Sequence, residues 1–411
     1  MTTTTATRRS FLTKPAQLIS ASAATANQAA LQRDVLVCIF QRGGADGLSM
    51  VVPHGDKDYY LARPSLAVPK PGGAVGGSAI DLNGFFGLHP ALAGLKPVWD
   101  AGQLAVVHAC GSPDLTHSHF DAMDYMERGI PGQKSATNGW LGRHLAMTQT
   151  ADDSTLRAVS FGALLQPSLR GSSAVTLTSI EDYRLRTWNI ELPKVRKAHG
   201  ELYKGSNLLA GAGRRTLGSL TLMEQVVRST GNPYKPSGGA VYPDTDYGKT
   251  LKQIAQLVKA DVGVQVACAD IGDWDTHDDQ GGAQGQLADN LREFGAGLLA
   301  LYTDLSAYLG KVAIVTMSEF GRRVEENGSG TDHGHGNGNA MFVMGGNVVG
   351  KKVYGRWPGL AVEQRYGPGD LQVTTDFRDV IAEIVSKRMR NTQLGEVFPG
   401  YTPTFRGLVR A

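Results

Sequence analysis

"VLVCIFQRGGADGLSMVVPHGD", residues 35–56, is the stretch that decides the fold. Residues 35–40 are apolar without interruption, and the glycine-rich segment that follows carries Asp46. Continuous rather than alternating apolarity predicts a strand buried on both faces, as in a parallel sheet that helices cover on each side. An acid directly after such a strand lies where open α/β sheets place their chemistry, at the carboxyl ends of the strands.

The same pattern recurs along the chain. Further short apolar runs lie at 104–110, 264–270, 312–317 and 341–344. Segments with the spacing of amphipathic helices alternate with them, at 89–101, 119–128, 245–261, 284–309 and 376–389. This alternation predicts a doubly wound α/β sheet in which most strands are parallel. We expect a single domain over 34–411, with 150–243 as an inserted or cap region on the sheet.

The composition is that of a soluble, globular chain of enzyme size. Of the 411 residues, 41% are hydrophobic and 19% are charged, which argues against a disordered chain. Residues 1–26 hold Arg8, Arg9 and Lys14 and no acid, so removing them from the 41 basic and 38 acidic residues leaves 38 of each. Because the chain also lacks a basic stripe with interleaved aromatic residues, we expect no nucleic-acid partner.

The N-terminal segment has the features of an export signal. Arg8 and Arg9 precede a Phe-Leu pair, a mildly apolar stretch and an Ala-x-Ala sequence at 24–26. This pattern resembles a twin-arginine signal, with 1–33 as signal and linker. We therefore expect a periplasmic or secreted protein whose partner during export is the twin-arginine translocase. The apolar stretch is too short and too polar to span a bilayer, so we expect no transmembrane segment.

The three cysteines, Cys38, Cys110 and Cys268, lie inside apolar runs. Their small, odd number excludes a disulfide framework, and we expect buried, inert thiols. The alternative is that one of them lies near a metal.

Polar side chains that suit metal binding follow four of the predicted strands. They are Asp46; Thr116, His117, Ser118 and His119 in "THSHFDAMDYME"; Asp275 and His277 in "IGDWDTHDDQ"; and Asp332, His333 and His335 in "GSGTDHGHGNGN". Carboxylates combined with imidazoles suit a divalent transition metal such as zinc or manganese better than calcium or magnesium. We expect one or two such ions at this edge of the sheet, with copper or iron as the alternative.

Several of these residues also fit a purely structural role. Asp46 equally fits a turn after the strand. Thr116 is better explained as a helix cap, whereas Ser118 fits a cap and a nucleophile equally well. His335 also fits a surface position on a flexible stretch.

The motifs "FQRGGADGL", "VVPHGD", "THSHFDAMDYME", "WDTHDDQ", "SEFGRR" and "TDHGHGNGNAM" together resemble an exported bacterial family, domain of unknown function 1501. The resemblance runs through the chain from 34 to 400. It implies membership of the alkaline phosphatase and sulfatase superfamily. The implied fold is an alkaline-phosphatase-like three-layer sandwich, with a central, mostly parallel sheet and a metal centre at the strand ends.

The resemblance also implies roles for single residues. The metal ligands would be Asp46, Asp275, His277, Asp332, His333 and His335. Ser118 resembles the nucleophile at the start of a helix, with Thr116 as the fallback. We further expect His119 to orient the leaving group or bind the oxyanion, and His117 and Arg322 to contact the anionic substrate.

These inferences together predict an exported, metal-dependent hydrolase of an anionic ester that uses a metal-activated Ser or Thr nucleophile. A phosphate monoester or diester is favoured over a sulfate ester. In "CGSPD", Cys110 lies three residues before Pro113 and Asp114 stands next, which departs from the pattern of formylglycine sulfatases. The alternatives are a copper- or iron-dependent redox enzyme on the same fold, and a non-catalytic, metal-binding assembly protein of the envelope.

Overall fold

Strand β1 (Val35–Gln41) lies inside the main sheet of the protein, whose computed structural model describes residues 34–73, 77–185, 191–328 and 335–411. Successive side chains of a strand point to opposite faces. Val35, Val37 and Ile39 join one buried apolar cluster. Leu36, Cys38 and Phe40 join the other. Both faces of β1 are therefore buried, as its continuous apolar run predicts.

The main sheet has nine strands in the order β13-β5-β12-β9-β1-β8-β6-β7, with β14 also paired to β5. They are β5 (Leu104–Gly111), β6 (Ala158–Phe161), β7 (Val175–Leu177), β8 (Val266–Ile271), β9 (Val312–Ser318), β12 (Asn339–Met344), β13 (Lys352–Tyr354) and β14 (Thr375–Asp376). Only β12 runs antiparallel to its neighbours, β5 and β9, among the described strands of this sheet. The predicted, mostly parallel α/β sheet is therefore confirmed.

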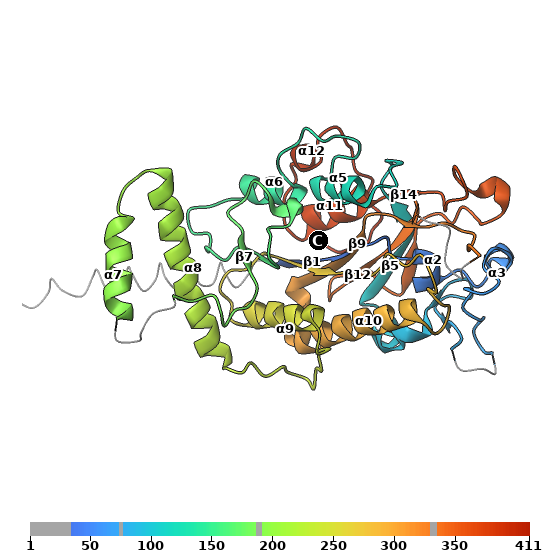
Figure 1. Ribbon diagram of the computed structural model, residues 1–411, viewed down its shortest axis with the longest axis horizontal. Helices are drawn as coiled ribbons and strands as arrows, with labels where there is room; N and C mark the ends of the chain where they lie inside the picture. The colour runs from blue at the N-terminus through green and yellow to red at the C-terminus, as the bar shows by residue number, and fades with distance from the viewer. Residues whose placement is uncertain (1–33, 74–76, 186–190, 329–334) are drawn as a thin grey trace, which may run out of the picture.

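Helices cover both faces of the sheet and give three layers (Figure 1). One face carries η1 (Pro90–Leu95), α4 (Lys96–Asp100), α9 (Asp246–Lys259), α10 (Gln286–Asp304) and η3 (Ser306–Lys311). The other carries α5 (His119–Arg128), α6 (Trp140–Met147), α11 (Phe377–Lys387) and α12 (Leu394–Val397). Each helix predicted from apolar spacing corresponds to one or two of these elements.

Eight shorter elements lie outside the main sheet and the helices that cover it. They are α2 (Gly47–Met50), β2 (Val51–Val52), α3 (Lys57–Ala62), β3 (Ile80–Asp81), β4 (Gly87–Leu88), β10 (Gly321–Arg322), β11 (His335–Gly336) and η4 (Val362–Gln364). Strands β2, β4 and β3 form a small antiparallel sheet, and β10 pairs with β11.

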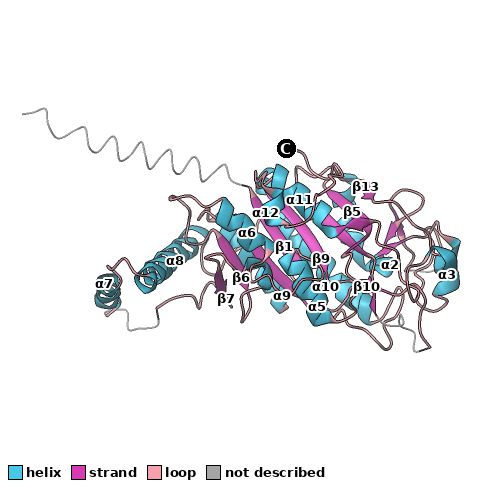
Figure 2. Cartoon of the chain, turned by 90° about the horizontal axis from the view of Figure 1, so that it is seen from above, coloured by secondary structure: helices cyan, strands magenta, loops and turns pink. Residues whose placement is uncertain are grey.

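The region 150–243, predicted as an insertion or cap, has two parts. Strands β6 and β7, joined through η2 (Pro167–Leu169), extend the main sheet beyond β8. Helices α7 (Leu192–Leu202) and α8 (Leu208–Thr230) stand clear of the sheet at its β7 edge (Figures 1 and 2). The first part is thus integral to the sheet, and the second part projects from it.

The direction of the strands brings four loops to one edge of the sheet. Gln41, at the end of β1, pairs with Ile271 of β8 and with Ser318 of β9. Strand β5 points the same way as β9, because both are antiparallel to β12. The segments after β1, β5, β8 and β9 therefore start from the same edge, where open α/β sheets build their sites.

Two glycines let the loop after β1 pack tightly against its neighbours. A Cβ atom on Gly43 would lie 2.6 Å from the backbone nitrogen of Asp275, after β8. A Cβ atom on Gly44 would lie 2.6 Å from the ring of Phe320, after β9. Both residues have positive φ, 123° and 69°, a backbone conformation that favours glycine. Close contact between the three loops therefore depends on the absence of side chains here.

Cys38, Cys110 and Cys268 are buried, free thiols, as predicted. Within the described residues, no helix has the length and apolarity needed to cross a membrane.

We predict that Gly43→Ala destabilises the protein more than Gly369→Ala. The φ angles of the two glycines are similar, 123° and 117°, so each alanine pays a backbone strain of about 1–2 kcal/mol. Only Gly43 faces backbone atoms that a Cβ would clash with, whereas a Cβ on Gly369 meets nothing within 4 Å. The clash should add about 1–3 kcal/mol, measured by urea unfolding. Equal losses in the two variants would show that the loops do not need this contact.

Candidate metal centre

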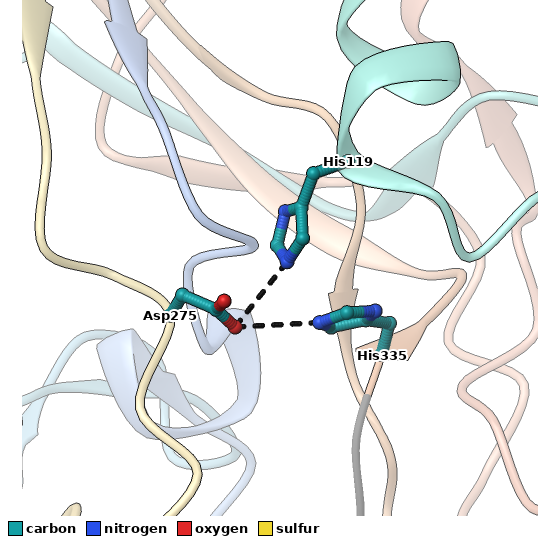
Figure 3. Close-up of side chains that lie close together, drawn as sticks. All are labelled: His119, Asp275 and His335. Carbon is teal, nitrogen blue, oxygen red and sulfur yellow. Dashed lines mark hydrogen bonds and ion pairs between the residues drawn. The ribbon is translucent and has the colours of Figure 1, made fainter.

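Asp275 lies at the centre of a cluster that joins three distant parts of the chain (Figure 3). The Nε2 atoms of His119 and His335 each lie 3.3 Å from Asp275 Oδ1. The ligand atoms of these three residues all lie within 4.8 Å of one another. In the part of the chain that the structure describes, this is the one group of three or more His, Cys, Asp or Glu side chains that could hold a metal ion.

Each member of the cluster comes from the carboxyl edge of the sheet. His119 is the first residue of α5, which follows β5. Asp275 lies in the segment after β8. His335 lies in β11, where it pairs with Arg322 of β10, shortly after β9. The sheet therefore brings together residues that are far apart in the sequence.

The ring of His119 is held by a buried carboxylate. His119 Nδ1 lies 2.7 Å from Glu319 Oε1, and the same oxygen accepts a hydrogen bond of 2.8 Å from the backbone N–H of Gly43. An ionised carboxylate only accepts hydrogen bonds, so His119 Nδ1 carries the proton. In the neutral imidazole, the lone pair then lies on Nε2, which faces Asp275.

The ring of His335 is fixed in the same way by the backbone. His335 Nδ1 donates a hydrogen bond of 2.8 Å to the carbonyl oxygen of His117. Because a carbonyl only accepts, Nδ1 carries the proton here too, and the lone pair of the neutral ring lies on Nε2. Outer hydrogen bonds of this type orient the histidines of metal sites.

With both rings neutral, three hydrogen-bond acceptors converge: His119 Nε2, His335 Nε2 and Asp275 Oδ1. A proton on either Nε2 would instead make that atom a donor to Asp275 Oδ1, which lies 3.3 Å from both. His119 Nε2 is buried and has no hydrogen-bond partner among the described residues, and a cation bound there would satisfy it. Two ligands that bind one tetrahedral ion at about 2.0–2.1 Å lie about 3.3 Å apart. Both nitrogen-to-oxygen distances are 3.3 Å. The residues thus fit a divalent metal ion.

The surrounding charges favour an ionised Asp275. Burial opposes ionisation, but His119 and Arg322 outweigh it and lower the pKa of Asp275 below its ordinary value. The hydrogen bond to Glu319 raises the pKa of His119 against the effect of burial. Burial, with the neighbouring His119, lowers the pKa of His335.

His277 borders the cluster on its solvent side. Its Nε2 lies 2.8 Å from Asp275 Oδ1, and its side chain is 48% exposed. Its ring centroid lies 5.3 Å from that of His335. Its role as a ligand stays a prediction. Asp332 and His333, which we also predicted as ligands, lie outside the described residues.

Asp46 was predicted as a ligand, but it has other partners and is not in the cluster. Its Oδ2 accepts hydrogen bonds from Arg63 at 2.5 Å, Ser49 at 2.7 Å and Gln280 at 2.8 Å. Its Oδ1 caps α2 by accepting from the backbone N–H groups of Leu48 and Ser49. The charge of Arg63 lowers the pKa of Asp46 although burial acts the other way. Asp46 therefore has the role that we considered as the alternative to metal binding, a turn residue after β1 that caps α2.

Arg322 was predicted to contact the anionic substrate, and the structure places it inside the protein. Its side chain is buried. The guanidinium donates to the carbonyl oxygens of Gly43, Gly44 and Trp274, at 2.7–2.9 Å, and to Asp275 Oδ1 at 2.9 Å. Arg322 therefore joins the loops of the site and has no exposed surface to offer an anion.

The residues before α5 form the helix cap and a contact between His117 and Asp370. Ser118 is the N-cap of α5 and is exposed, with its Oγ accepting from the backbone N–H of Asp121 at 3.5 Å. Thr116 Oγ1 accepts from the backbone N–H of Ser118 at 3.2 Å. His117 Nε2 lies 3.3 Å from Asp370 Oδ2. These contacts do not decide whether Ser118 or Thr116 is a nucleophile, and both assignments stay predictions.

Glu319 is the functional residue that the sequence reasoning missed. Glu319 directly follows β9, and Asp46 lies in the segment after β1. Because functional side chains of α/β sheets lie after the carboxyl ends of strands, the position of Glu319 also indicated a functional residue. His119 was predicted to orient the leaving group or bind the oxyanion, and the structure places its Nε2 in the group that could hold a metal ion. A carboxylate on the other ring nitrogen orients the histidines of metal sites in the same way, so the cluster makes His119 an additional candidate ligand.

The chain belongs to the family described as Protein of unknown function (DUF1501), whose model matches residues 101–393. No protein with a curated description matches the sequence significantly. A sulfatase from Pseudoalteromonas sp. is similar in structure with a TM-score of 0.36 and 13% identity, over 97% of this chain and 78% of the sulfatase. A phosphonate monoester hydrolase of Agrobacterium radiobacter gives 0.34 and 10%, over 91% and 79%. Neither likeness is close enough to assign an activity.

We predict that the metal affinity depends on His119 and on Glu319. His119→Ala removes a ligand and should abolish tight binding of one zinc or manganese ion. Glu319→Gln keeps the shape but weakens the hold on the ring, and should lower the affinity about 10-fold or more. Titration against a coloured chelator measures both effects.

The control is His199→Gln on α7, because the ring of His199 hydrogen-bonds to the carbonyl oxygen of Val195 in its own helix and lies against the ring of Tyr203. Its affinity should equal that of the unmodified protein. Equal affinity in His119→Ala would exclude the cluster as the metal site.

Proposed function

We propose that this member of the family is a metal-dependent hydrolase of anionic esters, acting on a phosphate monoester or diester rather than on a sulfate. The observation that carries the proposal is the convergence of His119 Nε2, His335 Nε2 and Asp275 Oδ1 at the carboxyl edge of a mostly parallel sheet. With both imidazoles neutral, all three atoms are acceptors that would hold a cation, and a cation beside a helix start attracts an anion.

When bound to His119, Asp275 and His335, a divalent transition metal supplies positive charge to the oxygens of the ester and lowers the pKa of a nearby hydroxyl. The chain itself contributes position. Glu319 holds the ring of His119, and the carbonyl of His117 holds the ring of His335. These contacts orient both imidazoles before any ligand arrives.

Ser118 is the nucleophile that we favour. It is exposed, it immediately precedes His119, and it stands at the N-terminus of the ten-residue helix α5. Its Oγ acts as an acceptor in the cap, so its proton is still available to a base. Backbone N–H groups at the helix start favour an incoming anion. Thr116 is the fallback.

Phosphate is favoured over sulfate because of Cys110. The thiol lies in β5, is buried and contacts Met341 Sδ at 3.4 Å. Burial raises the pKa of Cys110 well above its ordinary value. A residue inside the core strand has no access to substrate, so Cys110 does not suit a formylglycine nucleophile.

A second candidate function is a redox enzyme. Two histidines and one carboxylate also form the ligand set of non-haem iron oxygenases. Metal content separates the two functions, and we predict zinc or manganese in protein isolated from its native host after export. Stoichiometric iron or copper, found by elemental analysis, would favour the redox enzyme.

We predict that Ser118→Ala lowers cleavage of nitrophenyl phosphate by at least about 100-fold, because the attacking hydroxyl is lost. Metal content should be unchanged, which separates loss of the nucleophile from loss of the site. The matched control is Thr116→Ala, two residues earlier, which should retain cleavage within about fivefold.

Loss of cleavage in Thr116→Ala, with cleavage retained in Ser118→Ala, would make Thr116 the nucleophile. Unchanged cleavage in both variants would exclude both hydroxyls. Metal-loaded protein that cleaves neither a nitrophenyl phosphate monoester nor the diester would contradict the hydrolase, and would leave the redox enzyme and the non-catalytic, metal-binding protein as candidates.

A further inference from the structure

Helix α7 and the first half of α8 form an arm that projects from the rest of the molecule in both views (Figures 1 and 2), while Met223 and Val226 in the second half of α8 pack in the core. No residue of α7 is buried. The buried residues of α8 lie mainly in its second half, from Ser219 to Val226, which is the root of the arm. The turn at 203–207, between the two helices, is the tip.

The tip has a defined conformation. Asn207 caps α8 by accepting from the backbone N–H of Ala210 at 2.8 Å. Arg214 Nη1 donates to the carbonyl oxygens of Tyr203 and Gly205, each at 2.5 Å. The ring of Tyr203 packs on Gly213, where a Cβ would lie 2.3 Å from it. The turn is thus fixed by hydrogen bonds from the first two turns of α8.

The apolar side chains of the tip have no such partners. Leu202 is 69% exposed, Leu208 93% and Leu209 72%. Single exposed leucines are common on protein surfaces. Three within eight residues, at the helix ends on either side of the turn 203–207, are typical of a surface that binds another protein or a membrane.

The arm is also the basic part of the chain. Residues 191–230 hold seven Lys and Arg and three Glu, a net charge of +4, whereas the whole chain holds 41 and 38, a net charge of +3. The remaining residues therefore carry 34 basic and 35 acidic side chains, a net charge of −1. Lys197, Lys204 and Arg215 are exposed near the leucines or along the stem.

We propose that this arm docks the protein on the surface of an anionic phospholipid membrane. The three leucines enter the boundary between headgroups and acyl chains, and the Lys and Arg side chains of the stem contact lipid phosphates. The charge decides between partners. A second copy of the chain would bring an arm of +4 against an arm of +4, which opposes association, whereas an anionic lipid surface complements it.

Docking is independent of the metal centre. The arm projects from the β7 edge of the sheet, and the cluster lies at the carboxyl ends of the strands (Figures 1 and 3). His119→Ala protein should therefore bind membranes as the unmodified chain does.

Cosedimentation of the whole protein with vesicles tests the proposal. We expect binding to vesicles of phosphatidylglycerol and phosphatidylcholine, little binding to phosphatidylcholine alone, and release at high salt. Leu208→Ser/Leu209→Ser should weaken binding about 10-fold or more. Lys197→Glu/Arg215→Glu should weaken it by about fivefold or more for each charge removed.

Matched controls change equally exposed residues elsewhere. Leu61→Ser alters a leucine that is 75% exposed, on α3. Lys351→Glu/Lys352→Glu alters two exposed lysines before and in β13. Both should bind like the unmodified chain, and circular dichroism checks that every variant is folded.

No binding to anionic vesicles overturns the proposal, as does binding that the controls weaken as much as the arm variants. A dimer in light scattering that Leu208→Ser/Leu209→Ser converts to a monomer, without vesicle binding by either form, would show that the leucines meet a second copy of the chain and would also overturn it.

Discussion

The buried guanidinium of Arg322 is the contact on which the site depends. It donates to the carbonyl oxygens of Gly43, Gly44 and Trp274 and to the carboxylate of Asp275. One side chain from the segment after β9 therefore fastens the loops after β1 and β8. Its planar, fixed set of donors suits this task, which the flexible ammonium of a lysine does not reproduce. The positive φ of the two glycines lets the backbone come close enough to be held.

Fixing the loops forces acceptors toward one another before any ion binds. Glu319 receives the backbone N–H of Gly43 and the ring of His119, so the loop after β1 and the start of α5 share one carboxylate. His335 is fixed through the carbonyl of His117. An electrostatic cost follows from holding three acceptors together, and a bound cation offsets it. The site is thus preorganised by its supporting residues, as binding sites with precise geometry require.

The fold was predictable because burial on both faces leaves continuous apolar runs, as in β1, β5, β8 and β9. The direction of β12 was not, since an apolar run has the same appearance in either direction. The position of the site followed from the parallel strands, and Asp275 and His335 were correctly grouped there. The partner of Asp46 was not predictable, because Arg63 and Gln280 reach it only in the folded chain. Glu319 was predictable as a site residue because it directly follows β9, but it was not among the predicted residues.

The central claim is that His119, Asp275 and His335 hold one ion. A crystal structure of the metal-loaded protein, with anomalous scattering recorded at the absorption edge of the metal, tests it most directly. The account predicts a single strong anomalous peak about 2.0–2.2 Å from His119 Nε2, Asp275 Oδ1 and His335 Nε2. A peak held by other residues, with His119 Nε2 and Asp275 Oδ1 still in direct contact, would contradict it.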